Sequence, residues 1–172
     1  VLLTTDSAEL AAIGRDAGAE VPFLRPPELA RDDTPMLPVM QHAVRHVMAE
    51  GWIPDLILLL QPTAPFRRVE DIRAAVGRLE SEPEADSIVS IEQIPAHFAP
   101  HFVMKVEEGR LMPFLPDGLR VTRRQDAPPA YTRNGQFYVT RTACLMEANS
   151  IYGTRCLPFV TTHPAANLDT LE

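Results

Sequence analysis

The chain has 172 residues, 45% of them hydrophobic and 23% charged, a composition typical of one globular domain with enough apolar material for a core. A formal net charge of −7 and a pI near 5.2 argue against a general nucleic-acid binder, which would show a basic stripe. The sequence shows no apolar run long enough to span a membrane and no secretory leader, so we expect a cytoplasmic protein without membrane or nucleic-acid partners.

The cysteines and basic residues narrow the chemistry. Cys144 and Cys156 have neither CxxC spacing nor a zinc pattern, so we expect free thiols in a reducing cytoplasm. Every basic residue except Lys105 is arginine. Because the guanidinium is a planar fork suited to carboxylate and phosphate, a small anionic ligand fits this composition, although coding bias would produce the same imbalance.

The first part of the chain predicts strand, helix and strand in turn. Residues 1–6 indicate a strand, and a helix follows with Asp6 as its N-cap and Gly18 at its end. A short strand is expected over 20–23. The predicted core face of the helix consists of Leu10, Ile13 and Ala17.

A second helix is expected within 32–51, beginning at Thr34-Pro35 and ending at Gly51. Its predicted core positions are Val39 or Met40, Ala43, Val44 and Val47. The continuous apolar run 55–60 then predicts a central strand, which is followed by a helix over 69–82 and a strand over 85–94.

This alternation predicts a three-layer α/β fold with a mainly parallel sheet, in one domain spanning 1–172. In such sheets ligands bind at the carboxyl ends of the strands, which is where residues 61–68 fall. Pro62 and Pro65 end the strand pairing and stiffen this loop, so Gln61 and Thr63 can offer hydrogen bonds in a fixed geometry. An ordinary strand-to-helix connection is the alternative interpretation.

Residues 95–122 interrupt the alternation. The segment predicts a β-hairpin that turns at Glu107 to Arg110, inserted before an arginine-rich stretch. Its apolar residues need cover, which either a partner subunit or the hairpin's own domain would supply. From Gln136 the rhythm resumes, with strands over 136–140 and 156–162 and a helix over 141–148.

Four ordered motifs carry a resemblance to a known family. They are "TTDSAELAAIGRDAGAEVPFLRPPELARDDT", "LLLQPTAPFR", "RRQDAPPAYTRNGQFY" and "NLDT". In order and spacing the chain resembles the acylneuraminate cytidylyltransferases, or CMP-sialic acid synthetases. The resemblance implies a nucleotide-diphospho-sugar transferase-like fold and a magnesium-dependent homodimer that transfers CMP from CTP to a sialic-acid-like nonulosonic acid and releases pyrophosphate.

The resemblance also implies roles for individual residues. Arg25 lies near the nucleotide, and Arg124 pairs the sugar carboxylate as a catalytic and substrate-binding group. The further substrate-binding residues it implies are Gln61, Thr63, Arg133 and Asn134. Taken without the resemblance, Arg123 and Arg124 are a solvated surface pair.

The resemblance implies that Mg²⁺ is held near the end of the chain by two aspartates flanking one residue. Here that place reads Asn167-Leu168-Asp169, so Asp169 matches the second aspartate and Asn167 replaces the first. An amide oxygen ligates Mg²⁺ without bringing charge, and we expect a weakened site that relies on the nucleotide's phosphates. Alternatively, these residues cap a helix that starts at Thr170.

Other departures from the family bear on activity and specificity. Thr132 follows Tyr131 where the family has arginine, and Pro35 and Met36 replace small hydroxyl residues. The family's glycine-rich CTP loop, of the type "ARGGSKG", precedes the part that matches Val1, so we expect weak CTP binding and no turnover by residues 1–172 alone. The alternatives are a non-catalytic sugar-acid or nucleotide-binding remnant, and a related sugar nucleotidyltransferase with another base or acceptor.

Overall fold

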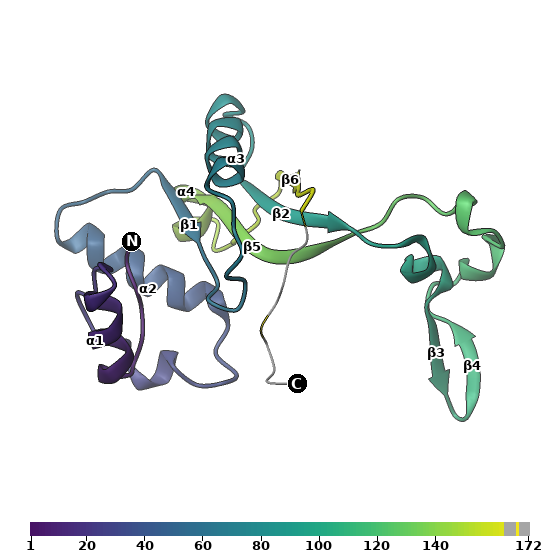
Figure 1. The fold of residues 1–172 in the computed structure, drawn as a ribbon, viewed down its shortest axis with the longest axis horizontal. Coiled ribbons are helices and arrows are strands. Elements are labelled where there is room, and N and C mark those ends of the chain that lie inside the picture. Colours follow the sequence, from purple (N-terminus) through teal and green to yellow (C-terminus); the bar gives the residue numbers. More distant parts are fainter. Residues whose placement is uncertain (164–167, 169–172) are drawn as a thin grey trace.

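The structure is a computed structural model and describes residues 1–163 and Leu168. Its main sheet has the strand order β1-β5-β2-β6 (Figure 1). β5 pairs antiparallel with both β1 and β2, whereas β6 pairs parallel with β2, so three of these four strands run in the same direction. The strands are β1 (Leu56–Leu59), β2 (Ser87–Gln93), β5 (Tyr131–Arg141) and β6 (Cys156–Val160).

β5 alone runs against the other three strands, which share one direction as expected for a mainly parallel sheet, and it makes two of the three pairings antiparallel. The chain leaves β2 at Gln93 and returns as β5, with the Ile94 N–H bonded to the Ala130 carbonyl at 3.0 Å. Because the chain comes back beside the end of β2 that it left, β5 runs antiparallel to β2.

Helices cover both faces of the sheet, which confirms the three-layer α/β class (Figure 1). On one face α3 (Val69–Ser81) packs Ala75 and Leu79 onto Phe137 and Val139 of β5. On the other face α2 (Met36–Ala49) and α4 (Thr142–Met146) pack around β1. The second cluster consists of Met40, Val44 and Leu145 with Ile57 and Leu59.

The two strands expected near the N-terminus are reduced to one contact. Leu2 and Glu20 form an isolated parallel bridge, supported by the Leu3 N–H bonded to the Glu20 carbonyl at 2.9 Å. Pairing stops there because Pro22 has no N–H to continue a ladder.

The first helix, α1 (Ala8–Asp16), also differs from its prediction. Ser7, not Asp6, is the N-cap, since its hydroxyl accepts the Leu10 N–H at 3.2 Å. The predicted core residues Leu10, Ile13 and Ala17 are all exposed, the first two by 54% and 57%, whereas Ala11 is buried. A Cβ on Gly14 would lie 2.4 Å from Leu3, so this helix is seated through its small residues, which allow close approach.

In α2, Val39, Met40 and Val44 are buried as predicted, whereas Ala43 and Val47 are only half-buried. The helix also buries Gln41, which the apolar pattern did not indicate. The Gln41 Nε2 donates to the Leu145 carbonyl and to Asn149 Oδ1, both at 2.8 Å, and so ties α2 to α4.

Residues 94–130 form an arm that projects from the sheet (Figure 1). Near its tip β3 (Met104–Glu107) pairs with β4 (Arg110–Pro113), and Glu107 faces Arg110 as predicted. Glu108 and Gly109 both have positive φ, the conformation that a two-residue hairpin turn requires. The arm contains the predicted 95–122 insertion and extends it to the segment of Arg124.

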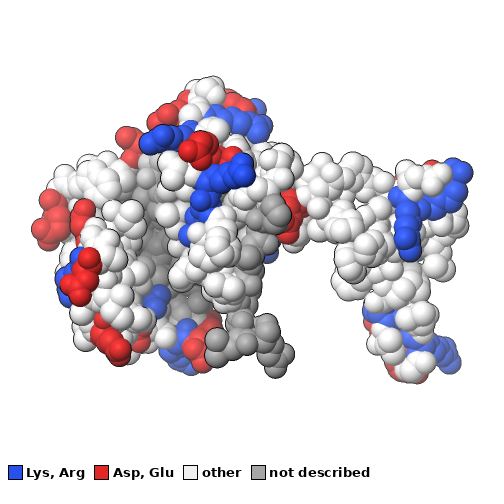
Figure 2. Space-filling model, in the orientation of Figure 1, with Lys and Arg blue, Asp and Glu red and all other residues white. Residues whose placement is uncertain are grey.

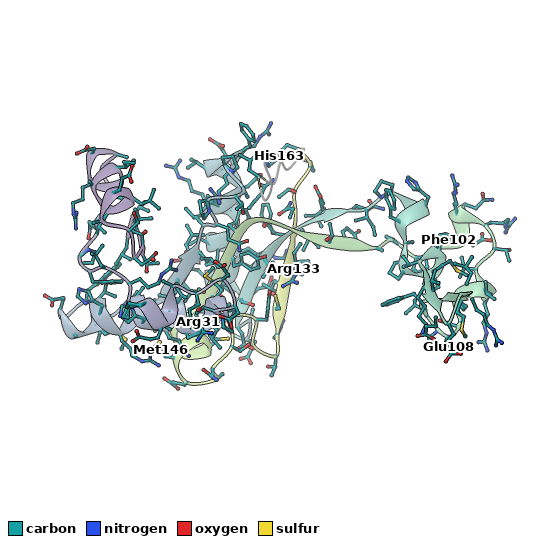
Figure 3. The ribbon with its side chains drawn as sticks, turned by 90° about the horizontal axis from the view of Figure 1, so that it is seen from below. Arg31, Phe102, Glu108, Arg133, Met146 and His163 are labelled. Carbon is teal, nitrogen blue, oxygen red and sulfur yellow. The ribbon has the colours of Figure 1, made fainter. Side chains whose placement is uncertain are left out.

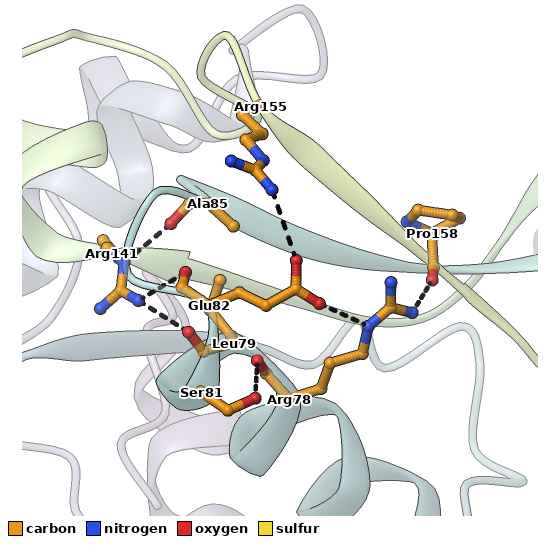
Figure 4. A network of polar contacts seen from close by, with 8 residues as sticks. All are labelled: Arg78, Leu79, Ser81, Glu82, Ala85, Arg141, Arg155 and Pro158. Carbon is orange, nitrogen blue, oxygen red and sulfur yellow. Dashed lines mark hydrogen bonds and ion pairs between the residues drawn. The ribbon is translucent and has the colours of Figure 1, made fainter.

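Arg141, at the end of β5, anchors α3 to the sheet (Figure 4). Its guanidinium donates to the carbonyls of Leu79 at 2.7 Å, Ala85 at 2.8 Å and Glu82 at 3.3 Å. The Leu79 and Glu82 carbonyls belong to the last turn and cap of α3. They also accept the backbone N–H groups of Glu82 at 3.3 Å and Ala85 at 2.9 Å, so Arg141 adds a charged donor at this end of the helix. Arg78 adds a bond to the Pro158 carbonyl at 2.9 Å and thereby ties α3 to β6.

Asp86 organises the connection between α4 and β6. Its carboxylate accepts the backbone N–H groups of Arg155 at 2.9 Å and Thr154 at 2.7 Å. These backbone bonds, with Arg155 the larger contributor, hold the pKa of the Asp86 carboxyl below its usual value. A Cβ on Gly153 would come within 2.3 Å of the Asp86 side chain, so the loop closes tightly on the carboxylate.

No helix in the described part of the chain is long and apolar enough to cross a membrane. Cys144 and Cys156 are free thiols, as the spacing predicted. Burial raises the pKa of Cys144, which behaves as a core residue.

We expect Arg141→Met to lower the free energy of unfolding by about 1–3 kcal/mol, because the partly buried carbonyls of Leu79, Glu82 and Ala85 lose a charged donor. Urea denaturation measures this change. Arg73→Met, at an exposed position of α3, is the matched control and should have little effect on the free energy of unfolding. Equal effects of the two substitutions would contradict the anchoring role.

We expect Asp86→Asn to destabilise the protein in a pH-dependent way. Because the folded-state pKa of Asp86 is depressed, its contribution is present above the ordinary aspartate pKa of about 3.9 and is lost as pH falls through the lower folded value. Thermal melts of wild type and variant from neutral to acid pH should therefore converge at low pH. A constant gap across that range would rule out the charge as its cause, and Asp32→Asn, at an exposed site, is the control.

Candidate substrate site at the carboxyl edge of the sheet

The carboxyl ends of β1, β2 and β6 lie at one edge of the sheet because these strands run in the same direction. Residues 61–68 follow β1, the arm follows β2, and residues 161–163 follow β6. The N-terminal end of β5, which carries Arg133 and Asn134, reaches the same edge because this strand runs the other way. The sheet therefore collects at one edge most of the side chains that the motifs singled out.

Gln61 lies directly against β5. Gly135 has a φ of +71°, and a Cβ on it would lie 3.3 Å from Oε1 of Gln61. Only a glycine allows both this backbone conformation and this close approach. The structure thus places the Gln61 side chain against Asn134 and Gly135, which lie where β5 bulges from its pairing with β2.

Asn134 is buried and its polar groups are engaged by the chain itself. Its Nδ2 donates to Thr161 Oγ1 at 2.7 Å, and its Oδ1 accepts the Gln136 N–H at 3.4 Å. The Thr161 N–H in turn bonds to the Ile91 carbonyl at 2.9 Å. Asn134 therefore links the N-terminal end of β5 to Thr161, the residue that follows β6, beside Gln61.

Thr63 connects the 61–68 loop to the end of the chain. Its carbonyl accepts the backbone N–H of Leu168 at 2.7 Å. Leu168 is the middle residue of the predicted magnesium motif, whereas Asn167 and Asp169 lie outside the described residues. Within the described ranges no group of three or more His, Cys, Asp or Glu side chains is placed to hold a metal ion.

Arg133 borders an open hollow of about 340 Å³ on the sheet face opposite α3. Its guanidinium carbon lies 5.6 Å from the centroid of the Tyr152 ring, and Nη1 donates to the Tyr152 hydroxyl. The Tyr138 ring packs edge-on against Tyr152 at 6.3 Å, and burial raises the pKa of Tyr138. The remaining walls consist of Val89, Ile91, Cys156, Leu157 and Pro158.

This hollow combines one cation and one phenol with apolar walls, which suits a small anion that has an apolar portion. Tyr152 is a residue that the sequence did not indicate. It lies in the loop before β6, outside all four motifs, and only the fold brings its ring to Arg133.

Arg25 is held beside the N-terminal segment. Its N–H bonds to the Thr5 carbonyl at 2.8 Å, and its Nη2 lies 3.6 Å from Asp6 Oδ1. Its Nε is buried and has no partner among the described residues. The Arg25 side chain is 21% exposed, so the outer part of its guanidinium is a chemically suitable contact for a nucleotide phosphate or base.

Arg124 lies on the arm, apart from the carboxyl edge of the sheet that carries Gln61. It lies in a short 3-10 helix, and its side chain is exposed. Figure 2 shows basic residues at the outer end of the arm, and Figure 3 places Phe102 and Glu108 of the arm far from Arg133. Arg123 pairs with Asp126 at 2.6 Å, whereas no ion pair of Arg124 is found in the described part of the chain.

His42, His46 and His163 each contact another side chain of the fold. His42 and His46 both pack against the Phe23 ring, with ring centroids 4.7 Å apart in each case. His163 Nδ1 lies 3.3 Å from Asp71 Oδ2 and places the start of the final segment beside α3.

Arg67 is a second residue that sequence reasoning missed. Its Nε donates to the Gln136 carbonyl and its Nη2 to the Gln61 carbonyl, so one side chain joins the loop after β1 to β5. Burial lowers the pKa of Arg67. The arginine of "QPTAPFR" was visible as part of a motif, but no sequence signal distinguished its role from that of Arg68.

Comparisons with known proteins identify the family. No family model matches the chain. It is 28% identical over 171 residues to CMP-N,N'-diacetyllegionaminic acid synthase of Legionella pneumophila, covering 98% of this chain and 71% of that protein. It is 31% identical over 164 residues to the synthase of the same name from Campylobacter jejuni, covering 93% and 67%. A match to N-acylneuraminate cytidylyltransferase of Escherichia coli is 34% identical over 91 residues, covering 53% and 20%.

The fold has a counterpart among solved structures. CMP:2-keto-3-deoxy-manno-octonic acid synthetase in complex with CTP superposes with a TM-score of 0.61 at 14% identity, covering 97% of this chain and 75% of that one. At this identity the superposition supports the nucleotide-sugar transferase fold alone. From the sequence relatives, this chain belongs to the family of acylneuraminate cytidylyltransferases, which includes the CMP-legionaminic acid synthases.

Proposed function

We propose that this chain binds a nonulosonic acid and CTP for transfer of CMP to the sugar acid with release of pyrophosphate. The observation that carries the proposal is the hollow bordered by Arg133 and Tyr152. Arg133 is two residues from Gly135 in β5, against which the Gln61 side chain lies. A sugar acid needs a fork for its carboxylate, polar groups for its hydroxyls and apolar walls for its acyl groups. These three surfaces meet at this edge of the sheet.

In the proposed reaction, the anomeric hydroxyl of the sugar acid attacks the α-phosphorus of CTP, and pyrophosphate leaves in line with it. Arg133 and Gln61 hold the acceptor so that its hydroxyl is aligned, which is the main contribution that positioning makes to such a transfer. Arg25 contributes a partly exposed guanidinium on the nucleotide side.

We further propose Mg²⁺ as the cofactor, with Asp169 and Asn167 as its ligands together with phosphate oxygens of CTP. The bond between Leu168 and Thr63 supports this assignment, because it ties the motif to the 61–68 loop. Mg²⁺ supplies positive charge against the charge that develops on the phosphates.

A homodimer completes the proposal. The arm exposes large apolar side chains that its own domain does not cover, which indicates a protein contact. Arg124 lies on this arm, so a second copy would deliver it to the carboxylate of the sugar acid as a second guanidinium beside Arg133. The exposed apolar residues of the arm are Phe98, Val103, Met104, Val106, Leu111, Met112, Phe114 and Leu119.

Calorimetric titration tests the binding function. With Mg²⁺ present, we expect selectivity for CTP over ATP, GTP and UTP, and then binding of N,N'-diacetyllegionaminic acid or sialic acid to the CTP complex. Arg133→Lys keeps the charge but loses the fork, so sugar-acid affinity should fall about tenfold while CTP affinity stays constant. Arg73→Lys is the surface control. Absence of nucleotide selectivity and of sugar-acid binding would contradict the proposed function.

Mixed dimers test the role of Arg124. We expect Arg124→Lys, and more severely Arg124→Ala, to weaken sugar-acid binding without changing CTP affinity. A hybrid of one Arg124→Ala subunit and one Gln61→Ala subunit contains one intact site if the arm crosses to its partner, so half of the sites should recover wild-type affinity. Equal loss of CTP and sugar-acid affinity, or no recovery in the hybrid, would argue against this assignment.

Charged substitutions on the arm test the dimer. Val106 and Leu111 face each other across the hairpin and are 72% and 67% exposed. Val103→Glu, Val106→Glu and Leu111→Glu should shift sedimentation from dimer to monomer while the circular dichroism of the sheet is kept. Glu84→Lys, on the core domain, is the control. A wild-type protein that sediments as a monomer at high micromolar concentration would disprove the interface.

A further inference from the structure

Arg67 occupies the place where the pairing of β1 with β5 stops. The ladder runs from the pair Leu56 and Arg141 to the pair Leu59 and Tyr138. Two residues beyond Leu59 the chain reaches Gln61, and Pro62 then removes the next backbone donor. The Gln61 and Gln136 carbonyls on the two sides of this junction both accept from the Arg67 guanidinium.

The geometry suits arginine in particular. Nε and Nη2 are neighbouring donors of one rigid plane. Nε reaches the Gln136 carbonyl of β5, and Nη2 reaches the Gln61 carbonyl just after β1. Lysine has a single ammonium on a flexible stem and cannot reproduce this fixed spacing. The partly buried Arg67 therefore replaces the backbone ladder at the point where proline ends it.

The side chain of Gln61 depends on this junction. The Gln61 carbonyl also accepts the Ala64 N–H at 3.1 Å, so the backbone of Gln61 is fixed by a turn and by Arg67 together. Its amide oxygen then lies against Gly135, where a Cβ would be only 3.3 Å away. A shift of β1 relative to β5 would carry the Gln61 amide away from Gly135.

We propose that Arg67 is a positioning residue for the acceptor site. By bridging the Gln61 and Gln136 carbonyls, it holds the Gln61 amide against the Asn134-Gly135 bulge of β5. The inference rests on the proposed function for its consequence, sugar-acid binding. Its structural part, the bridge itself, is measurable without any ligand.

Amide hydrogen exchange tests the bridge. In Arg67→Lys the Ala64 amide, which bonds to the Gln61 carbonyl, should exchange at least about tenfold faster, because the loop loses its tie to β5. Arg68→Lys, at the exposed neighbouring position, should leave the rate unchanged. Equal exchange in wild type and Arg67→Lys would overturn the proposal.

A double-mutant cycle tests the coupling to function, with N,N'-diacetyllegionaminic acid as the probe in calorimetry with CTP and Mg²⁺. Arg67→Lys alone should weaken sugar-acid binding about tenfold and leave CTP affinity unchanged, a size within the coupling of contacting residues. If Arg67 acts through Gln61, Arg67→Lys should cost nothing further in a Gln61→Ala background. Additive losses would overturn the positioning role.

Gly135→Ala provides a second route that keeps Arg67 intact. The added Cβ displaces the Gln61 amide, so sugar-acid affinity should fall while Ala64 exchange stays near the wild-type rate. Unchanged affinity in Gly135→Ala would overturn the proposal even if Arg67→Lys does not fold. Failure of the wild type to bind any sugar acid would instead refute the proposed function, and the exchange rates would still decide whether the bridge exists.

Discussion

The central constraint on this structure is that β5 pairs with both β1 and β2. Residues 134–140 of this strand are buried, and Phe137 and Val139 form the centre of the core beneath α3. The N-terminal end of β5 carries Arg133 and the Asn134-Gly135 bulge. Its C-terminal end carries Arg141, which bonds to the end of α3. Because one strand carries both the site residues and the main helix anchor, the core and the candidate site are positioned together.

The direction of β5 also explains why the molecule has an arm. An antiparallel neighbour of β2 needs no crossover helix, so residues 94–130 are free to extend from the sheet. The resulting arm exposes apolar side chains and carries Arg124 away from the core. In the proposed function a second copy of the chain would bring Arg124 to the site of Gln61, which would link assembly to substrate binding.

Polar contacts at the carboxyl edge take the place of backbone pairing where the strands end. Arg67 joins the Gln61 and Gln136 carbonyls, and Asn134 joins β5 to Thr161. A charged or amide donor that meets a buried carbonyl is worth more than a surface ion pair, because an unmet carbonyl would lose its hydration without compensation. The edge is thus preorganised by side chains that need not touch the substrate themselves.

The sequence by itself determined the alternation of helices and strands, the hairpin turn at Glu108-Gly109 and the motif residues Gln61 and Asn134, because periodicity, turn chemistry and short motifs are local signals. It misplaced the cap of α1 and its buried face, since close packing at Gly14 is decided by Leu3 and not by the helix pattern. The direction of β5, the Arg67 bridge, the meeting of Arg133 with Tyr152 and the separation of Arg124 from Gln61 arose only in the tertiary structure. Each of these features joins residues far apart in sequence or depends on how strands lie beside one another, and local patterns carry no information about either.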